Sequence, residues 1–84
     1  ALVNMLGGFV SIEHGTRGPN LSSVTACAAG THAVSEACKT IMCGGADKML
    51  VVAAESAVTG VGVGGFAAMK ALSTRNDDPK HASR

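Results

Sequence analysis

The sequence predicts an α/β fold, and three observations support this interpretation. The run Leu21–Thr25 is short, apolar and β-branched, and it follows the turn pair Pro19-Asn20, which is typical of a buried strand. The next stretch carries apolar residues at helical spacing. Met49–Ala54 is then a continuous apolar run that fits a strand covered on both faces. Strand, helix and strand in that order predict a right-handed βαβ unit with parallel strands.

The helix between the two predicted strands is amphipathic and should end at Gly44-Gly45, because glycine pairs commonly terminate helices. His32 should pair with Glu36 one turn further along. Cys38 is expected to pack inside as part of the apolar stripe. The apolar positions of this helix, spaced i, i+3, i+4, i+7 and i+8, are Val34, Ala37, Cys38, Ile41 and Met42.

A further helix is predicted over residues 1–14, with His14-Gly15 as its C-terminal cap. The Gly7-Gly8 pair within it weakens an isolated helix, so we expect another stretch of backbone to pack against it. Residues 16–20 have the composition of a loop. His14 is expected to be a capping or surface group rather than a catalytic one.

Composition limits the possible functions. The 84 residues are 46% hydrophobic and 15% charged, which suits the interior of a larger protein, so we expect 1–84 to be part of one domain. A net charge of +1 gives no basic surface for nucleic acid. The three cysteines form no CxxC pair and no histidine has zinc-ligand spacing, so no metal site and a reducing compartment are expected. Neither a membrane-spanning run nor a signal peptide is evident.

Cys27 lies where the first predicted strand turns into the helix. A helix N-terminus carries partial positive charge and unpaired N–H groups, which favour a thiolate and can stabilise an oxyanion beside it. The small residues on either side, Ala26 and Ala28, leave room for an acyl group. The pattern is that of a nucleophile elbow with cysteine in place of serine. The competing interpretation is that Cys27 is a small buried apolar residue.

A glycine-rich segment follows the second predicted strand. Gly60, Gly62 and Gly65 formally match the dinucleotide fingerprint GxGxxG, but Glu55–Thr59 separate them from the strand. We therefore predict a flexible loop that brings Phe66 close to a pocket, although the pattern alone favours a core position for Phe66. A short helix is expected over residues 66–72, and a polar surface loop or linker over 73–81.

Several segments together resemble the β-ketoacyl-acyl carrier protein synthases. The resemblance covers essentially the whole chain, and two segments are similar to the type II synthase of bacterial fatty acid synthesis: Gly-Val-Gly-Gly-Phe, ending at Phe66, and Ala-Leu-Ser-Thr-Arg-Asn, starting at Ala71. The other matching segments are Gly18–Gly30, Gly44–Asp47 and Ala54-Glu55.

This resemblance implies a thiolase-like fold, of which the chain would form part of the first half. It implies that Cys27 accepts the acyl group and places its own backbone N–H in the oxyanion hole. Phe66 would border the acyl pocket, and Lys70 would lie on the side that meets the carrier protein. The implied partners are acyl carrier protein and a second copy in a homodimer, without membrane or nucleic acid. No cofactor is implied, because the substrates are carried on the carrier's phosphopantetheine. Family members are cytoplasmic in bacteria or organellar.

The family also uses two histidines and a lysine that would follow Arg84, and His14, His32 and His81 do not occupy their positions. We therefore expect the 84-residue span alone to be inactive. The function implied for the full-length protein is elongation of fatty acyl chains by decarboxylative condensation with malonyl carrier. One alternative is another cysteine acyltransferase, a thiolase or a polyketide ketosynthase. A second alternative is a non-catalytic α/β module in which Cys27 is buried.

Overall fold

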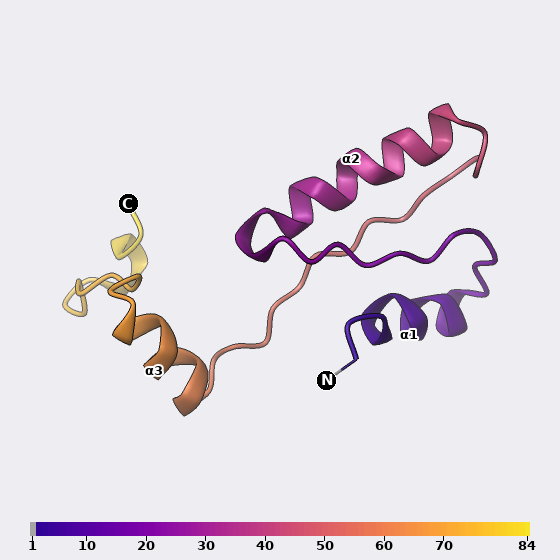
Figure 1. The fold of residues 1–84 in the computed structure, drawn as a ribbon. Coiled ribbons are helices and arrows are strands. Elements are labelled where there is room, and N and C mark those ends of the chain that lie inside the picture. The colour runs from indigo at the N-terminus through magenta and orange to yellow at the C-terminus, as the bar shows by residue number, and fades with distance from the viewer. Residues whose placement is uncertain (1) are drawn as a thin grey trace. The chain divides into compact units, whose positions relative to one another are not determined.

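The computed structural model describes residues 2–84, which divide between Ala54 and Glu55 into a first and a second unit, each considered by itself below. Figure 1 shows the path of the chain through its helices and 3-10 turns. These are α1 (Met5–His14), η1 (Ala26–Ala28), α2 (Ala29–Met42), α3 (Gly60–Ala68) and η2 (Pro79–His81).

Helix α1 confirms the first predicted helix and its glycine cap, but it begins at Met5. Residue 1 of the prediction lies outside the described residues. Gly15 adopts a left-handed conformation with φ of 64°, and its N–H donates to the carbonyl of Ser11. The Ser11 hydroxyl in turn donates to the carbonyl of Thr16 at 2.9 Å. The carbonyl of Ser11 in the last turn is thus satisfied by residues that follow the helix, since the N–H of Thr16 also donates to it at 3.2 Å.

The glycine pair in α1 has a neighbour at only one of its two positions. A Cβ on Gly7 would collide with the side-chain oxygen of Asn20, whereas a Cβ on Gly8 would meet nothing within 4 Å. The loop after α1 therefore packs closely on the helix at Gly7. The contacting group is a side chain rather than the backbone that the sequence predicted.

Helix α2 ends as predicted at the Gly44-Gly45 pair. Gly44 has φ of 77°, a conformation that costs glycine little and other residues more. Its N–H donates to the carbonyl of Ile41 at 3.0 Å, and the N–H of Gly45 donates to the carbonyl of Thr40 at 2.8 Å. This pair of hydrogen bonds is a Schellman motif, which uses the left-handed residue to close the helix.

The predicted βαβ unit is not confirmed: no strand occurs within residues 2–84, and both predicted strands are extended segments instead. The order extended–helix–extended is present, and the second segment returns past the start of α2, because a Cβ on Gly30 would lie 3.2 Å from that of Ala53. Residues 21–25 and 49–54 form no ladder of hydrogen bonds with each other or with another described segment. A β-strand needs such a partner, and an apolar pattern records only the capacity to pair.

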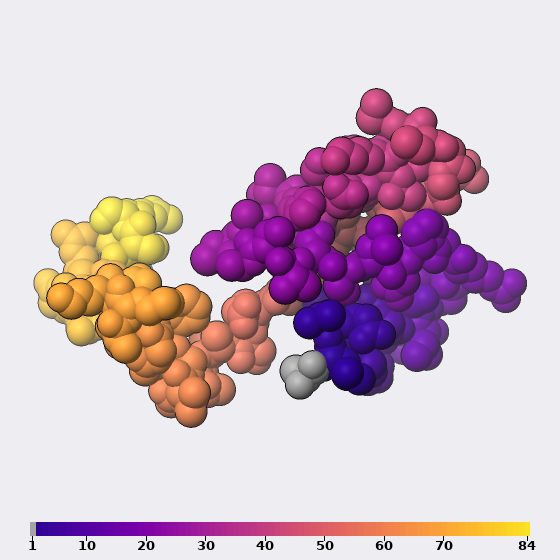
Figure 2. All heavy atoms as spheres, viewed as in Figure 1, coloured from indigo at the N-terminus to yellow at the C-terminus, as the bar shows by residue number. Residues whose placement is uncertain are grey.

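Burial is sparse. Ala37 in the middle of α2 is the one described residue that is buried, with 8% of its surface exposed. Its neighbours on the apolar stripe are open, with Val34 51% and Met42 84% exposed. Cys38 is also exposed, so the prediction that it packs inside is wrong. Figure 2 shows the side chains of α2, magenta to pink, on the surface of their unit. Of the five residues on the predicted apolar face of α2, Ala37 alone is buried among the described residues.

In the second unit the glycine-rich segment is a helix rather than the predicted flexible loop. Helix α3 starts at Gly60, so the helix expected over residues 66–72 begins earlier and ends at Ala68. The hydroxyl of Thr59 caps the helix by accepting a hydrogen bond from the N–H of Gly62 at 3.1 Å. A Cβ on Gly62 would collide with the carbonyl oxygen of Ala57, so this position needs glycine. The helix thus forms despite the low helix propensity of glycine, because Thr59 caps it and because only glycine fits at position 62.

The polar loop predicted over residues 73–81 is largely confirmed, with the short η2 turn added at its end. Pro79 occupies the first turn of η2, where its missing N–H costs nothing. The imidazole Nδ1 of His81 lies 2.9 Å from Asp78 Oδ2, and the guanidinium of Arg75 donates to the carbonyl of His81 at 3.2 Å. These exposed side chains fold the segment back on itself.

The left-handed closure of α2 gives a test of the fold. Replacing Gly44 with Ala in the full-length protein should lower the free energy of unfolding by about 1 kcal/mol, because a Cβ is disfavoured at positive φ. Gly8→Ala is the matched control, since Gly8 lies inside α1 with open space around it. That change should instead stabilise α1 by about 1 kcal/mol through helix propensity. Urea denaturation measures both, and equal effects of the two changes would contradict this assignment.

Candidate functional site

Cys27 lies in the centre of η1, the single 3-10 turn that leads directly into α2. Its side chain is exposed, not sealed within the helix or among packed side chains. The sequence predicted Cys27 at the turn from a strand into a helix: the position before α2 is confirmed, whereas the segment that precedes it is extended but not a strand. A thiol at this point is accessible from solvent and adjacent to the positive end of the α2 dipole.

The residue before Cys27 has an unusual backbone conformation. Ala26 has φ of 53°, one of two positive values among non-glycine residues in the described part of the chain. An alanine in this region is strained, because its Cβ crowds the neighbouring carbonyl. Nothing in the sequence predicted it, since alanine is not a residue that favours left-handed backbone. The strain lies at the sharp change of direction that presents the Cys27 side chain.

The backbone N–H groups around Cys27 differ in whether they have a hydrogen-bond acceptor. The N–H of Ala28 donates to the carbonyl of Thr25 at 3.2 Å, and the N–H of Ala29 donates to that of Ala26. The N–H of Cys27 itself has no acceptor within residues 2–84. A free amide on the same residue as an exposed thiol can donate to an oxygen on a group attached to the sulfur.

His32 pairs with Glu36 as the sequence predicted, with Nε2 lying 3.5 Å from Oε1. The same carboxylate oxygen is 3.2 Å from the Lys39 ammonium. A contact that sequence analysis missed joins the other imidazole nitrogen, Nδ1, to the hydroxyl of Thr25 at 3.4 Å. The turn through η1 folds Thr25 back beside α2, and no periodic pattern predicts a contact across such a reversal.

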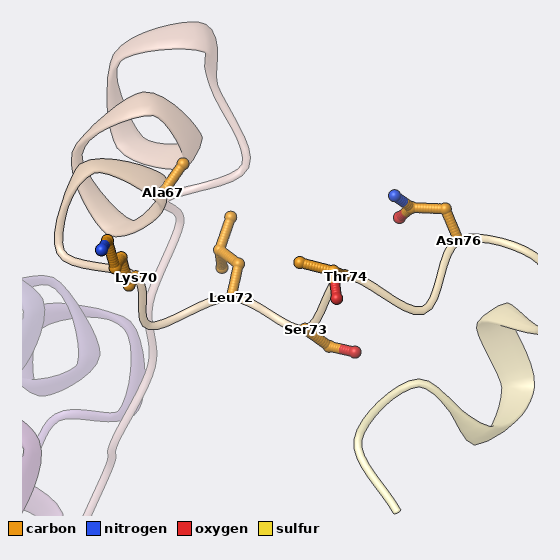
Figure 3. Close-up of a pocket in the computed structure, with 6 residues that line it drawn as sticks. All are labelled: Ala67, Lys70, Leu72, Ser73, Thr74 and Asn76. Carbon is orange, nitrogen blue, oxygen red and sulfur yellow. The ribbon is translucent and has the colours of Figure 1, made fainter.

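The other two predicted site residues lie in the second unit. Phe66 is in α3 and is 40% exposed, so it is neither buried core nor part of a loop. A hollow of about 460 Å³ borders the end of α3, and Lys70 is among the residues that line it. Figure 3 shows Leu72 pointing toward Ala67 there, with the amide of Asn76 on the same side of the chain. Phe66 does not line this hollow. Its lining consists of Ala67, Lys70, Leu72, Ser73, Thr74 and Asn76.

Lys70 occupies the position after α3 where glycine is usual. Its φ is 57°, its N–H donates to the carbonyl of Ala67 at 2.9 Å, and the N–H of Ala71 donates to that of Phe66 at 3.0 Å. These bonds form the same Schellman closure that Gly44 provides for α2. A long basic side chain is thus held at a backbone position that disfavours it.

Within residues 2–84, no group of three or more His, Cys, Asp or Glu side chains is arranged to hold a metal ion. Among the helices described above, none is both long and apolar enough to cross a membrane.

Comparison with known proteins places the chain in a family. The sequence profile described as Beta-ketoacyl synthase, N-terminal domain, matches residues 1–84. The chain belongs to this family, which has the thiolase-like fold that its motifs implied. It is 50% identical over 84 residues to the 3-oxoacyl-[acyl-carrier-protein] synthase 2 of Coxiella burnetii, covering 100% of this chain and 20% of that protein.

Other relatives carry similar names. The chain is 51% identical over 83 residues to 3-oxoacyl-[acyl-carrier-protein] synthase 2 of Vibrio cholerae, covering 99% of this chain and 20% of that protein. It is 44% identical over 84 residues to the chloroplastic 3-oxoacyl-[acyl-carrier-protein] synthase I of Arabidopsis thaliana, covering 100% of this chain and 18% of that protein. The chain thus spans about a fifth of the length of the relatives it matches.

The left-handed Lys70 leads to a stability prediction. Lys70→Gly in the full-length protein should raise the free energy of unfolding by about 1 kcal/mol, because glycine adopts positive φ without a Cβ penalty. The control is Lys39→Gly, the same change inside α2, which should lower it by about 1 kcal/mol through helix propensity. Chemical denaturation of the two variants measures the opposite signs. A loss of stability in both would show that Lys70 is not strained.

Proposed function

We propose that the full-length protein to which this chain belongs is a 3-oxoacyl-[acyl-carrier-protein] synthase and that Cys27 is its acyl-accepting nucleophile. The observation that carries the proposal is the exposed Cys27 thiol, with its own N–H unpaired, in the turn that opens α2. The relatives described above, which match along the whole chain and are named as 3-oxoacyl-[acyl-carrier-protein] synthases, support the same chemistry.

The proposed reaction begins with acyl transfer to Cys27. The thiolate attacks the carbonyl carbon of an acyl thioester on the carrier's phosphopantetheine, and a new S–C bond forms. The carrier thiolate leaves when the tetrahedral intermediate collapses, and it takes up a proton. Covalent capture by Cys27 holds the acyl chain in place while the second substrate enters.

The second stage forms the carbon–carbon bond. Malonyl carrier loses CO2, and the electron pair of the broken bond is left on the α-carbon. That carbon attacks the carbonyl of the Cys27 thioester, and the Cys27 thiolate leaves. The product is a 3-ketoacyl carrier two carbons longer than the starting acyl chain. The histidines and lysine that the family uses for decarboxylation do not correspond to His14, His32 or His81.

The backbone around Cys27 supports a role in stabilising the tetrahedral intermediate. Both stages place a negative oxygen on a carbon attached to the Cys27 sulfur, and the unpaired Cys27 N–H is the proposed donor to that oxygen. Because the donor belongs to the same residue as the nucleophile, its position relative to the sulfur varies only with the χ1 angle of Cys27. The N-terminal end of α2 adds favourable electrostatics.

In the second unit, Phe66 is proposed to border the acyl chain, since it is a partly exposed aromatic side chain. Lys70 is proposed to meet the carrier protein, because it is exposed and lines the hollow at the end of α3. In the full-length protein, we propose that residues 21–25 and 49–54 pair as parallel strands of one thiolase-like domain. The proposed assembly is a homodimer without a bound cofactor, in the bacterial cytoplasm or an organelle.

Two alternatives are less well supported. A thiolase, a polyketide ketosynthase or another cysteine acyltransferase would use the same turn, but the relatives described above are named as acyl carrier protein synthases. A non-catalytic module with a buried Cys27 conflicts with the exposure of that thiol.

The nucleophile assignment is tested by substitution. Cys27→Ala in the full-length protein should abolish acyl-enzyme formation, because the attacking sulfur is lost. Cys38→Ala and Cys43→Ala remove equally exposed thiols elsewhere on the first unit and should leave it intact. Peptide mass spectrometry after incubation with acylated acyl carrier protein locates the acyl group on the enzyme. An acyl group on Cys38 or Cys43, or retained turnover without Cys27, would refute the assignment.

The carrier-binding role of Lys70 predicts an effect on KM. Lys70→Glu should raise KM for acyl carrier about tenfold at low salt and weaken its salt dependence, because a rim charge mainly governs association. The matched control is Lys80→Glu, an exposed lysine of η2 outside the hollow, with little change expected. Steady-state kinetics at several ionic strengths separates the two. Equal effects of both variants would indicate net charge alone.

A further inference from the structure

A small polar network holds the segment that precedes Cys27 against α2. The Thr25 hydroxyl lies 3.4 Å from His32 Nδ1, and His32 Nε2 lies 3.5 Å from Glu36 Oε1. The Lys39 ammonium donates to the same carboxylate oxygen at 3.2 Å. The network thus begins two residues before the proposed nucleophile and continues along two turns of the helix.

The Glu36 carboxylate determines which of the two ring nitrogens carries the proton when the His32 imidazole is neutral. An ionised carboxylate only accepts hydrogen bonds, so Nε2 facing it carries the ring proton. Nδ1 is then left with a lone pair and accepts from the Thr25 hydroxyl. The Lys39 ammonium lies 3.2 Å from the same carboxylate oxygen, so the ion pair helps to hold that oxygen beside Nε2.

Thr25 is the residue on which the reversal of the chain depends. It precedes η1, and its carbonyl already accepts from the N–H of Ala28 at 3.2 Å. The strained Ala26, with φ of 53°, follows it directly. A strained backbone persists only where its surroundings hold it, and the His32 contact is the side-chain interaction that ties Thr25 to α2.

We infer that His32 is a positioning residue for Cys27: through the Thr25 hydroxyl it holds the turn at Ala26 and so orients the thiol and its N–H. This inference rests on the proposed function, because it matters only if Cys27 is the nucleophile. His32 is not assigned as a general base. Its two ring nitrogens face Thr25 and Glu36, and within residues 2–84 no hydrogen bond joins the imidazole to the Cys27 sulfur.

Substitution of His32 by asparagine or by glutamine distinguishes its contact with Thr25 from its contact with Glu36. Asparagine places its amide where Nδ1 lies and can keep the bond to Thr25, whereas glutamine places its amide where Nε2 lies and keeps only the Glu36 contact. Full-length His32→Gln should therefore lower the rate of Cys27 alkylation by iodoacetamide about tenfold, and His32→Asn should stay within about twofold of the parent, in line with the loss of one hydrogen bond. In this alkylation the thiolate sulfur displaces iodide and forms one S–C bond.

Thr25 supplies the second pair of variants. Thr25→Val removes the hydroxyl at similar volume and should lower the rate of Cys27 alkylation as much as His32→Gln does. Thr25→Ser keeps the hydroxyl and should leave that rate unchanged. The double variant Thr25→Val, His32→Gln should be no slower than either single change, because both remove one interaction. Peptide mass spectrometry reports Cys38 and Cys43 in the same sample as internal references, and their rates should not change.

Turnover gives a further readout that general destabilisation would not produce. In His32→Gln, kcat for acyl transfer should fall while KM for acyl carrier is unchanged, and His32→Asn should restore kcat. Equal slowing by His32→Asn and His32→Gln, or no slowing by either, overturns the positioning role. Should Thr25→Val fail to fold, the two His32 variants decide alone. Failure of the proposed function is distinct, because the parent protein would then form no acyl adduct on Cys27.

Discussion

The reversal of chain direction at Ala26–Ala28 is the constraint on which the functional interpretation depends. An extended segment must turn into α2 within one short turn, and the chain achieves this with a left-handed alanine, φ 53°, directly before Cys27. A more gradual entry would place the thiol within regular helix, where its N–H would be committed to a carbonyl four residues earlier. The strained turn instead leaves both the thiol and its N–H free. Reactivity at this site is therefore a property of backbone geometry as much as of residue type.

Left-handed residues also close all three α-helices of the described chain. Gly15 and Gly44 do so after α1 and α2, where the absence of a Cβ makes the conformation inexpensive. Lys70 does so after α3 with a Cβ in place, and it lines the hollow there. Local stability alone favours glycine at that position. A residue that opposes the backbone preference is expected where its side chain has another role, which supports the assignment of Lys70 to binding.

Local signals in the sequence predicted α1, α2 and the place of Cys27 before α2 better than they predicted the sheet or α3. The caps at Gly15 and Gly44 and the pairing of His32 with Glu36 depend on residues a few positions apart, so their patterns are sufficient. The strands over 21–25 and 49–54 depend on a neighbour that the pattern does not specify. The glycines of α3 were interpreted as a loop because their low propensity was weighed without the Thr59 cap. Neither the left-handed Ala26 nor the Thr25–His32 contact has a sequence signal, because both arise from the reversal itself.

The proposed nucleophile lies in the first unit and the proposed substrate and carrier contacts lie in the second, and the two depend on different kinds of interaction. In the first, the orientation of Cys27 depends on short-range interactions: the Thr25–Ala28 hydrogen bond, the His32 contact and the end of α2. In the second, Phe66 and Lys70 occupy α3 and the residue that closes it, and contact with substrate or carrier depends on surfaces brought together by long-range packing. Local interactions specify a reactive thiol even where Ala37 is the single buried residue among those described. Chain-length selectivity has no such local determinant, since an acyl pocket is shaped by all the segments that enclose it.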